Sequence, residues 1–156
     1  MKKSLVTLGI MAGLSFSSAA EAKTVTFTTA LNSYGGNGAY LAIYLTDAQG
    51  KLHSTLHLAA PKAKYHKHLS NWSRGPAAAR RTIDGVTGAS VGSGRVLKVS
   101  VNVADALLDA GYQIRVDSAV EDGRDNPSDV VVQLGRDAMG KPVTGKGYVK
   151  SFRFDM

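Results

Sequence analysis

Apolar and polar residues alternate through most of the chain after residue 24, and this two-residue period constrains the fold more than any other feature. Side chains that alternate in this way point to opposite faces of a β-strand, so that one face packs in a core while the other meets solvent. The pattern predicts short strands at residues 25–29, 41–45, 52–58, 97–103, 112–116, 130–134 and 148–154. About seven such strands predict an all-β fold, an antiparallel sandwich of the immunoglobulin-like type.

Turn residues separate these predicted strands. The sequence DAQG at residues 47–50 predicts a hairpin, and the Asp, Asn, Gly and Pro of residues 121–127 predict a longer polar loop. Acidic residues gather in and just after that loop, and clustered carboxylates can bind calcium. Their spacing fits no EF-hand, so we interpret them as loop residues: Glu121, Asp122, Asp125 and Asp129.

Two stretches have helical rather than strand spacing. Apolar residues recur every three to four positions at residues 65–72 and predict one short helix, and residues 104–110 predict another helical turn or two. Both the first stretch and a glycine-rich segment fall within residues 61–94, where no clear strand pattern occurs. A loop region of that length inside one domain is usually functional.

The N-terminal residues predict export. Two lysines precede a mostly apolar run at residues 5–16, which is shorter than the ~20 residues that a membrane-spanning helix needs. A small-x-small cleavage site, Ala-Glu-Ala, follows and ends at Ala22. We predict a signal peptide at residues 1–22, a single periplasmic domain at residues 23–156, and no membrane span after cleavage.

Composition narrows the chemistry of such an exported domain. The chain has no cysteine, which excludes disulfides, Fe–S clusters, thiolate metal sites and cysteine nucleophiles. The formal net charge of +7 favours anionic ligands or partners, or simply solubility. Nucleic acid is a poor candidate for a partner in the periplasm.

One loop combines hydroxyl, acidic and very small residues in a way that a simple turn does not need. It reads DGVTGAS at residues 84–90 and is followed by VGSGR. Its glycines let the backbone approach a ligand closely, and Thr87 and Ser90 supply hydroxyl groups. The segment is neither a Walker loop nor a Rossmann fingerprint, because it lacks the Gly-Lys-Ser/Thr of the first and the βαβ unit of the second.

DGVTGAS resembles the acceptor motif of bacterial flavin transferases, which reads Asp, two variable residues, Ser or Thr, Gly, Ala, and Ser or Thr. The match covers Asp84, Thr87, Gly88, Ala89 and Ser90. The resemblance implies that FMN is joined as a phosphoester to the last hydroxyl, here Ser90 where Thr is more usual. Thr87 is the fallback acceptor.

The wider chain resembles a family of periplasmic β-sandwich domains of unknown function that occur beside PepSY-type membrane reductases implicated in ferric iron assimilation. The segments that carry this resemblance are AYLAIYLTDAQGK, LSNWSRG and DGVTGASVGSGRVL. It implies an FMN-carrying electron-transfer protein rather than a complete enzyme. The implied partners are a flavin transferase, a PepSY-type membrane reductase and a ferric chelate.

The basic, aromatic segment KAKYHKHLSNWSR at residues 62–74 has two interpretations. In the first it adjoins the flavin: Trp72 or Tyr65 stacks on the isoalloxazine, and Arg74 or a lysine offsets negative charge on the reduced ring. In the second it is a short amphipathic helix with Trp72 packed against the sandwich.

A different function, a periplasmic metal- or haem-binding module, rests on the histidines. Two lie at residues 53 and 57, where strand spacing points both side chains the same way, and two lie in the basic segment. Imidazole suits zinc, copper or iron. The candidate ligands for this alternative are His53, His57, His66 and His68.

Overall fold

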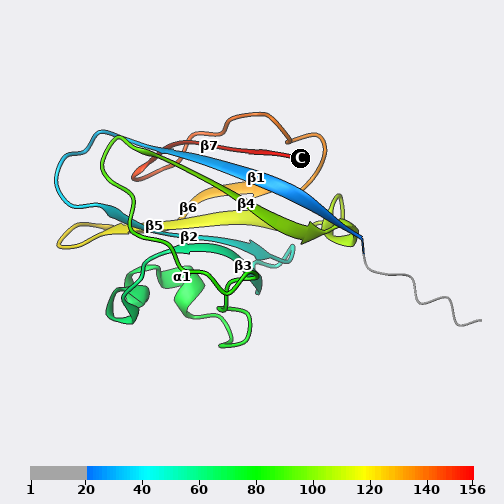
Figure 1. The fold of residues 1–156 in the computed structure, drawn as a ribbon, viewed down its shortest axis with the longest axis horizontal. Helices are drawn as coiled ribbons and strands as arrows, with labels where there is room; N and C mark the ends of the chain where they lie inside the picture. The colour runs from blue at the N-terminus through cyan, green and yellow to red at the C-terminus, as the bar shows by residue number, and fades with distance from the viewer. Residues whose placement is uncertain (1–20) are drawn as a thin grey trace, which may run out of the picture.

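Seven strands in two antiparallel sheets make up a computed structural model of the protein, which describes residues 21–156 (Figure 1). One sheet has the strand order β4-β1-β7 and the other β3-β2-β5-β6. The strands are β1 (Ala22–Leu31), β2 (Ala39–Thr46), β3 (Leu52–Ala59), β4 (Val96–Ala104), β5 (Gln113–Val120), β6 (Asp125–Gln133) and β7 (Val149–Asp155). The predicted all-β sandwich is therefore confirmed.

The strand order is that of an immunoglobulin-like sandwich with one permutation. In that fold strand B lies between A and E in one sheet, and strand F lies between C and G in the other. Here β1 and β4 take the places of B and E, while β2, β5 and β6 take those of C, F and G. The place of strand A beside β1 is filled by the last strand, β7. The C-terminal strand thus closes the three-stranded sheet.

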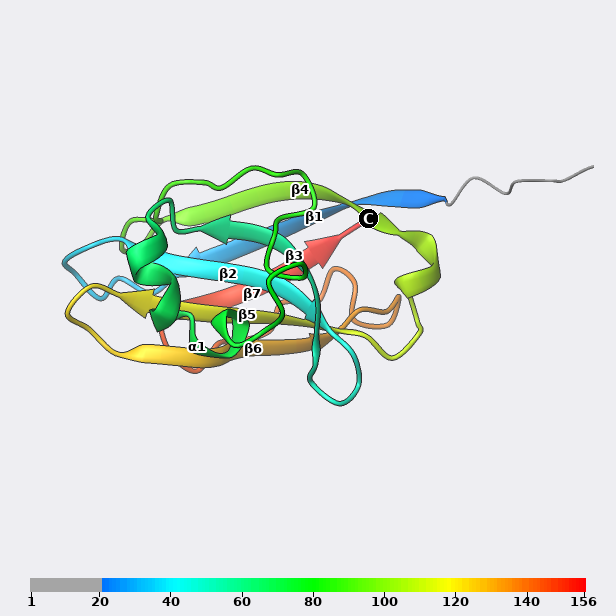
Figure 2. The same ribbon diagram turned by 90° about the horizontal axis from the view of Figure 1, so that it is seen from below.

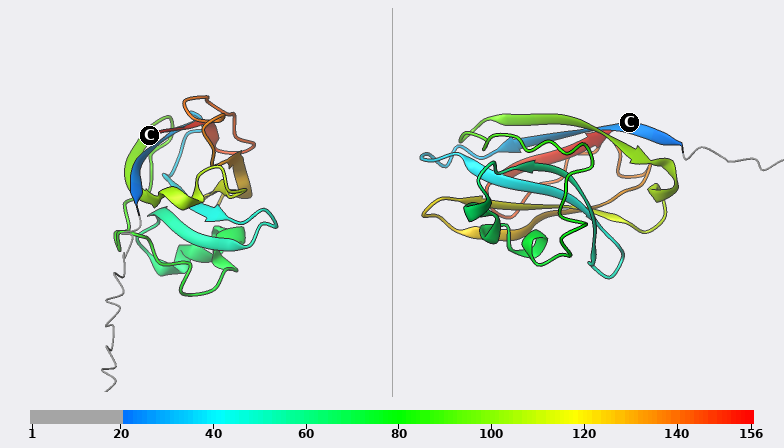
Figure 3. Two further views of the ribbon diagram at one scale, coloured as in Figure 1. Left: turned by 90° about the vertical axis from the view of Figure 1, so that its right-hand side faces the viewer. Right: turned by 60° about the horizontal axis from the view of Figure 1, so that its bottom comes forward.

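The main core lies between the sheets, and β2 is buried on both of its faces. Alternate residues of β2 enter this core: Leu41, Ile43 and Leu45. The intervening residues belong to a second apolar cluster on the outer face of the four-stranded sheet: Tyr40, Ala42 and Tyr44. The end-on view in Figure 3 shows why, because a third layer lies beneath that sheet.

This third layer comes from the connection between β3 and β4, which Figure 2 shows lying across the sheet. It contains a 3-10 helix, η1 (Ala63–His68), and one turn of α-helix, α1 (Ser70–Ser73). The sequence predicts a single helix here, but Leu69 has a non-helical backbone (φ −86, ψ 71) that divides it in two. The break turns Leu69 and Trp72 into the second cluster, where both are buried. A further helical turn, η2 (Asp105–Leu107), lies where one was predicted.

A buried carboxylate in β5 connects the helical segment to the sheet. Asp117 is fully buried. Its Oδ2 accepts the backbone N–H of Trp72 at 2.8 Å, and its Oδ1 accepts the Tyr44 hydroxyl at 2.7 Å. Burial, followed by the Asp117 charge, raises the pKa of Tyr44, which keeps that phenol protonated and able to donate.

Further bonds complete this anchor. Ser128 on β6 also donates its backbone N–H to Asp117, at 2.7 Å. The indole N–H of Trp72 donates to the Thr55 hydroxyl at 2.8 Å, and that hydroxyl in turn donates to the carbonyl of Ala79 at 2.7 Å. The helical segment is therefore bonded to β3, β5 and β6.

The predicted polar loop at residues 121–127 is wrong in extent, since β5 and β6 are joined by a short turn and β6 already begins at Asp125. Pro127 is tolerated because β6 is an edge strand, where a missing N–H is least costly. Asp129, which was interpreted as a loop residue, is buried, and its carboxylate accepts hydrogen bonds from the segment that leads into β7. The donors are the Ser118 hydroxyl and the backbone N–H groups of Lys146, Gly147 and Val149.

The predicted signal peptide lies outside the described residues apart from its last two positions, and the last of them, Ala22, opens β1. Within residues 21–156 no helix has the length and apolar character needed to cross a membrane.

Replacing Asp117 tests the anchor. We expect Asp117→Ala to lower the free energy of unfolding by at least about 3 kcal/mol, because two buried donors and one partly buried donor lose their acceptor. Tyr44→Phe is the matched control. It removes one donor and leaves the carboxylate with two, so we expect a loss of about 1 kcal/mol. Urea unfolding measures both, and equal losses in the two variants would contradict this role for Asp117.

Candidate functional site

The segment that contains DGVTGAS runs along the edges of β3 and β2 as an interrupted extra strand. Its isolated bridges pair Thr82 with Thr55, Thr87 with Leu58, and Val91 with Ala39. The N–H of Gly88 donates to the carbonyl of Leu58 at 2.8 Å. The segment therefore covers the free edge of β3, which would otherwise expose unpaired backbone groups. Within DGVTGAS the attachment is through the backbone, and just beyond it the side chain of Val91 is buried in the main core.

The side chains of the motif accordingly face solvent. Asp84, Thr87, Ala89 and Ser90 are all exposed. The Asp84 carboxylate accepts the N–H of Val86 at 2.9 Å, which shapes the turn at the start of the motif. Both candidate acceptor hydroxyls thus lie at the surface on a segment that is fixed to the sheet.

Gly88 is the motif residue that packs most closely on the sandwich. A Cβ atom at this position would lie 3.0 Å from Nε2 and 3.1 Å from Cε1 of His57. The His57 side chain is buried, and its Nε2 has no hydrogen-bond partner. Burial lowers the pKa of His57, with the Asp84 carboxylate acting in the opposite direction. The motif glycine is therefore required by a neutral imidazole beneath it.

Two depressions flank the motif, and each is lined by one of its hydroxyl residues. The Thr87 depression has a volume of about 740 Å³, and its polar lining includes Asp84, Arg80, Arg81 and His66. The Ser90 depression has a volume of about 210 Å³ and is lined by Tyr40, Pro61, Lys62, Tyr65, Ser90 and Glu121.

The Ser90 depression contains an aromatic platform. Tyr65 stacks on Tyr40 with 4.6 Å between ring centroids and 16° between ring planes. The Tyr65 hydroxyl donates to Glu121 at 2.9 Å, and the Lys64 ammonium lies 4.8 Å from the Tyr65 ring centroid. Tyr40 thus stacks on the Tyr65 ring, and the flexible Lys64 side chain places its ammonium over the same ring.

Trp72 and Arg74, which were predicted to adjoin a flavin, do not line the Ser90 depression. Trp72 is 1 % exposed, with its ring edge-on to His66 at 5.3 Å. This is the packing alternative, although Trp72 also contributes atoms to the lining of the Thr87 depression. Arg74 is exposed just after α1 and lines neither depression. The arginines at the site are instead Arg80 and Arg81, which the sequence interpretation missed although they directly precede the motif.

The four histidines lie in four separate environments. His53 is edge-on to Tyr112, His57 is buried under Gly88, His66 donates from Nε2 to the carbonyl of Ala60, and His68 contacts Asp125. His53 and His57, which were predicted to point the same way, lie in different surroundings, since His53 is exposed and His57 is buried, and the β2–β3 pairing shifts register twice in this stretch. Within residues 21–156 no three His, Cys, Asp or Glu side chains are grouped to hold a metal ion.

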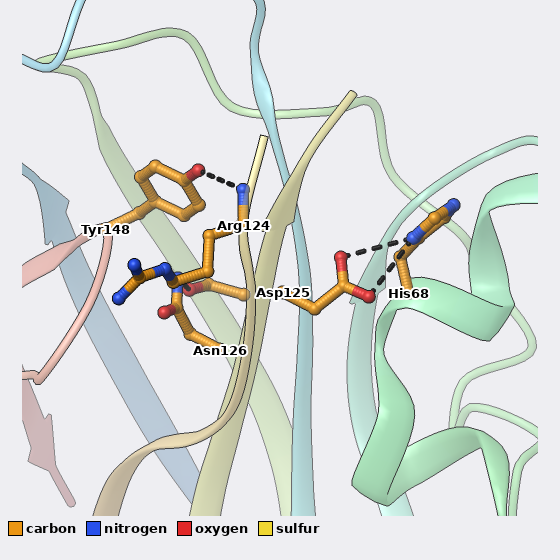
Figure 4. Close-up of polar contacts among 6 residues, drawn as sticks. His68, Arg124, Asp125, Asn126 and Tyr148 are labelled. Carbon is orange, nitrogen blue, oxygen red and sulfur yellow. Dashed lines mark hydrogen bonds and ion pairs between the residues drawn. The ribbon is translucent and has the colours of Figure 1, made fainter. Parts of the chain in front are cut away.

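The acidic residues after β5 are dispersed in the same way. Figure 4 shows the Asp125 carboxylate pointing toward His68, with Nδ1 at 3.1 and 3.2 Å from its two oxygens. Arg124 and Asn126 lie on the other side of the strand with Tyr148, whose hydroxyl accepts the Arg124 backbone N–H at 3.0 Å. Alternation along β6 therefore divides this stretch between two surfaces.

The letters GASVG at residues 88–92 also match the Gly-x-Ser-x-Gly spacing of a hydrolase nucleophile elbow. An elbow requires a sharp turn from a strand into a helix. Here Val91 forms a bridge to Ala39 and the chain continues into β4. A Cβ added to Gly38 would lie 3.0 Å from the Ser90 Oγ, whereas Nε2 of His57 faces Gly88. The fold does not give this serine the setting of an elbow.

A Gly88→Ala substitution tests the contact with His57. We expect the added methyl to lower the free energy of unfolding by about 1–3 kcal/mol, the usual cost of overpacking. In a His57→Ala background the cost should vanish or change sign, because Ala restricts the unfolded chain more than Gly does. Urea unfolding of the four proteins in this cycle measures the coupling, and an equal cost in both backgrounds would refute it.

Comparison with known families finds one match, to the family described as predicted periplasmic protein (DUF2271), over residues 22–151. No curated protein and no solved structure matches the chain. The description agrees with the periplasmic localisation predicted from the N-terminal residues, and the matched range spans nearly all of the domain. The chain belongs to this family of predicted periplasmic proteins of unknown function.

Proposed function

We propose that the protein is a periplasmic electron-transfer protein that holds one FMN in phosphoester linkage to Ser90. The observation that carries the proposal is the placement of DGVTGAS, an exposed segment that is attached to β3 through its backbone and continues into the buried Val91 beside β2. A transferase that recognises the motif needs both a free hydroxyl and small flanking residues. Gly88 and Ala89 provide those flanks, and the Ser90 side chain is exposed.

The modification is a balanced group transfer from a flavin dinucleotide. A bond forms between the Ser90 Oγ and the phosphorus of the FMN half, and the pyrophosphate P–O bond breaks. The other mononucleotide leaves, and the hydroxyl proton is released. The chain contributes a fixed, accessible nucleophile, while the transferase supplies activation.

The residues around Ser90 fit such a group. Lys62 lines the same depression and offsets the charge of a phosphodiester, and the outer face of Tyr65 offers a surface for stacking once Lys64 moves aside. The depression, about 210 Å³, is smaller than the 300–1,000 Å³ usual for sites that enclose a ligand. A cofactor there stays partly exposed, as electron exchange with partner proteins requires.

FMN, when bound, links two-electron donors to one-electron acceptors. We propose a PepSY-type membrane reductase as the donor and a ferric chelate as the acceptor. The net charge of +7 favours the approach of anionic chelates. The covalent linkage keeps the cofactor in a compartment where free FMN is scarce.

The acceptor atom is tested by co-expressing the chain with a flavin transferase. We expect a band that fluoresces after denaturation and an intact mass raised by one FMN less one water. Ser90→Ala should abolish both signals, and Thr87→Val should retain them, because it leaves the acceptor oxygen in place. An unmodified Ser90 in protein recovered from its native host would overturn the proposal.

The platform is tested by Tyr65→Leu in the modified protein. Stacking on a tyrosine quenches flavin emission, so we expect the folded variant to fluoresce several-fold more strongly than the wild type, with equal emission after denaturation. Tyr112→Leu is the matched control, because Tyr112 lies far from Ser90. It directly precedes Gln113, which pairs with Thr46 at the end of β2, whereas the motif segment pairs with Ala39 at the beginning of β2. Equal emission from the wild type and both variants would exclude stacking on Tyr65.

A further inference from the structure

The Thr87 depression has a basic lining that the proposed flavin linkage does not use. Arg80 and Arg81 contribute two positive charges, and Asp84 contributes one negative charge. The apolar part of the lining comes from Leu58, Trp72, Ala77 and Ile83. A depression of about 740 Å³ that combines apolar walls with a few converging polar groups has the character of a small-molecule site.

Arg80 has an unmet bonding requirement. Its Nε is buried and has no hydrogen-bond partner among residues 21–156. The backbone of this residue is held in a turn, where its N–H donates to the carbonyl of Pro76 at 3.1 Å. The guanidinium is therefore presented from a fixed point, and a buried donor without an acceptor is costly. An oxygen in the depression does not reach Nε as the side chain stands, so Arg80 must turn toward a ligand, and the bond to the ligand oxygen then removes that cost.

The other polar groups of the lining leave room for an anion. One Asp84 oxygen is already engaged by the N–H of Val86. His66 donates from Nε2 to the carbonyl of Ala60, so this nitrogen is already engaged. Arg81 is exposed and adds a second cation at the mouth.

We propose that the Thr87 depression binds a small multivalent oxyanion, a polycarboxylate or a phosphate, through a bidentate contact with Arg80 and a second contact with Arg81. The planar guanidinium fork matches carboxylate and phosphate groups, and such paired bonds are stronger than neutral ones. This inference does not rest on the proposed flavin. Because Thr87 and Asp84 belong to both the depression and the motif, a bound anion lies directly beside DGVTGAS.

Two sources could supply the oxyanion: a free small molecule or the phosphodiester of a cofactor on the adjacent motif. Calorimetric titration of unmodified protein with citrate and with inorganic phosphate, at constant ionic strength, tests the shared chemistry. We expect saturable binding of at least one of them. Repeating the titration with flavin-modified protein distinguishes the sources, since retained binding assigns the site to a free anion and lost binding assigns it to the cofactor phosphate.

Variants identify the contact. Arg80→Gln should weaken binding about ten- to a hundredfold, as expected for losing charge-assisted hydrogen bonds. Arg80→Lys should also weaken it, because an ammonium keeps the charge but not the fork. The matched control is Arg124→Gln/Lys146→Gln, which removes two cations from a separate depression beside Tyr148 and should change affinity less than about twofold.

Circular dichroism and urea unfolding verify that each variant is folded. Should Arg80 variants not fold, Arg81→Gln measures the same site and should weaken binding severalfold. The proposal is overturned if neither anion binds saturably. It is also overturned if the Arg124/Lys146 control weakens binding as much as the Arg80 or Arg81 variants do, because binding would then follow net charge alone.

Discussion

The buried carboxylate of Asp117 is the interaction on which the placement of the candidate site depends. It joins Tyr44, Trp72 and Ser128, which lie far apart in sequence, and so holds the helical segment on the outer face of the sheet. Both depressions have one wall on that segment and another on the motif. An unpaired buried carboxylate would be costly, so the fold that buries Asp117 must also supply its donors. The position of the helical segment, and with it the site, therefore depends on the hydrogen bonds of Asp117 as well as on loop packing.

The motif segment combines rigid backbone with free side chains. Its bridges to β3 and β2 place Thr87 and Ser90 at set points along the sheet edge, while the hydroxyls themselves bear no structural bonds. The exception is position 88, where the chain approaches His57 too closely for any side chain larger than hydrogen to fit without displacement. Glycine at position 88 is thus explained by the close packing on His57 as well as by the access that a modifying enzyme would need.

Much of the strand pattern was predictable because a two-residue period reports one buried face directly. The order of the strands was not, since the place of β7 beside β1 follows from a pairing between the two ends of the chain. Trp72 shows the limit at the site: its spacing indicates one apolar stripe, but only the bonds to Asp117 and Thr55 reveal that its ring is enclosed. The environment of His57 was not predictable, because the pairing of β3 with β2 shifts register twice, which single-strand periodicity cannot detect.

The two depressions have different chemistry although they share one wall. The Ser90 side offers stacked tyrosines and one lysine, which suits a planar ring and a single phosphodiester. The Thr87 side offers an unpartnered arginine donor with apolar walls, which suits a compact oxyanion. Thr87 lines one and Ser90 the other, and the backbone of this stretch is bonded to Leu58 through Gly88 and to Ala39 through Val91. A redox group on one side and an anionic reactant on the other would be held near each other by a single fixed segment, without any movement of the sandwich.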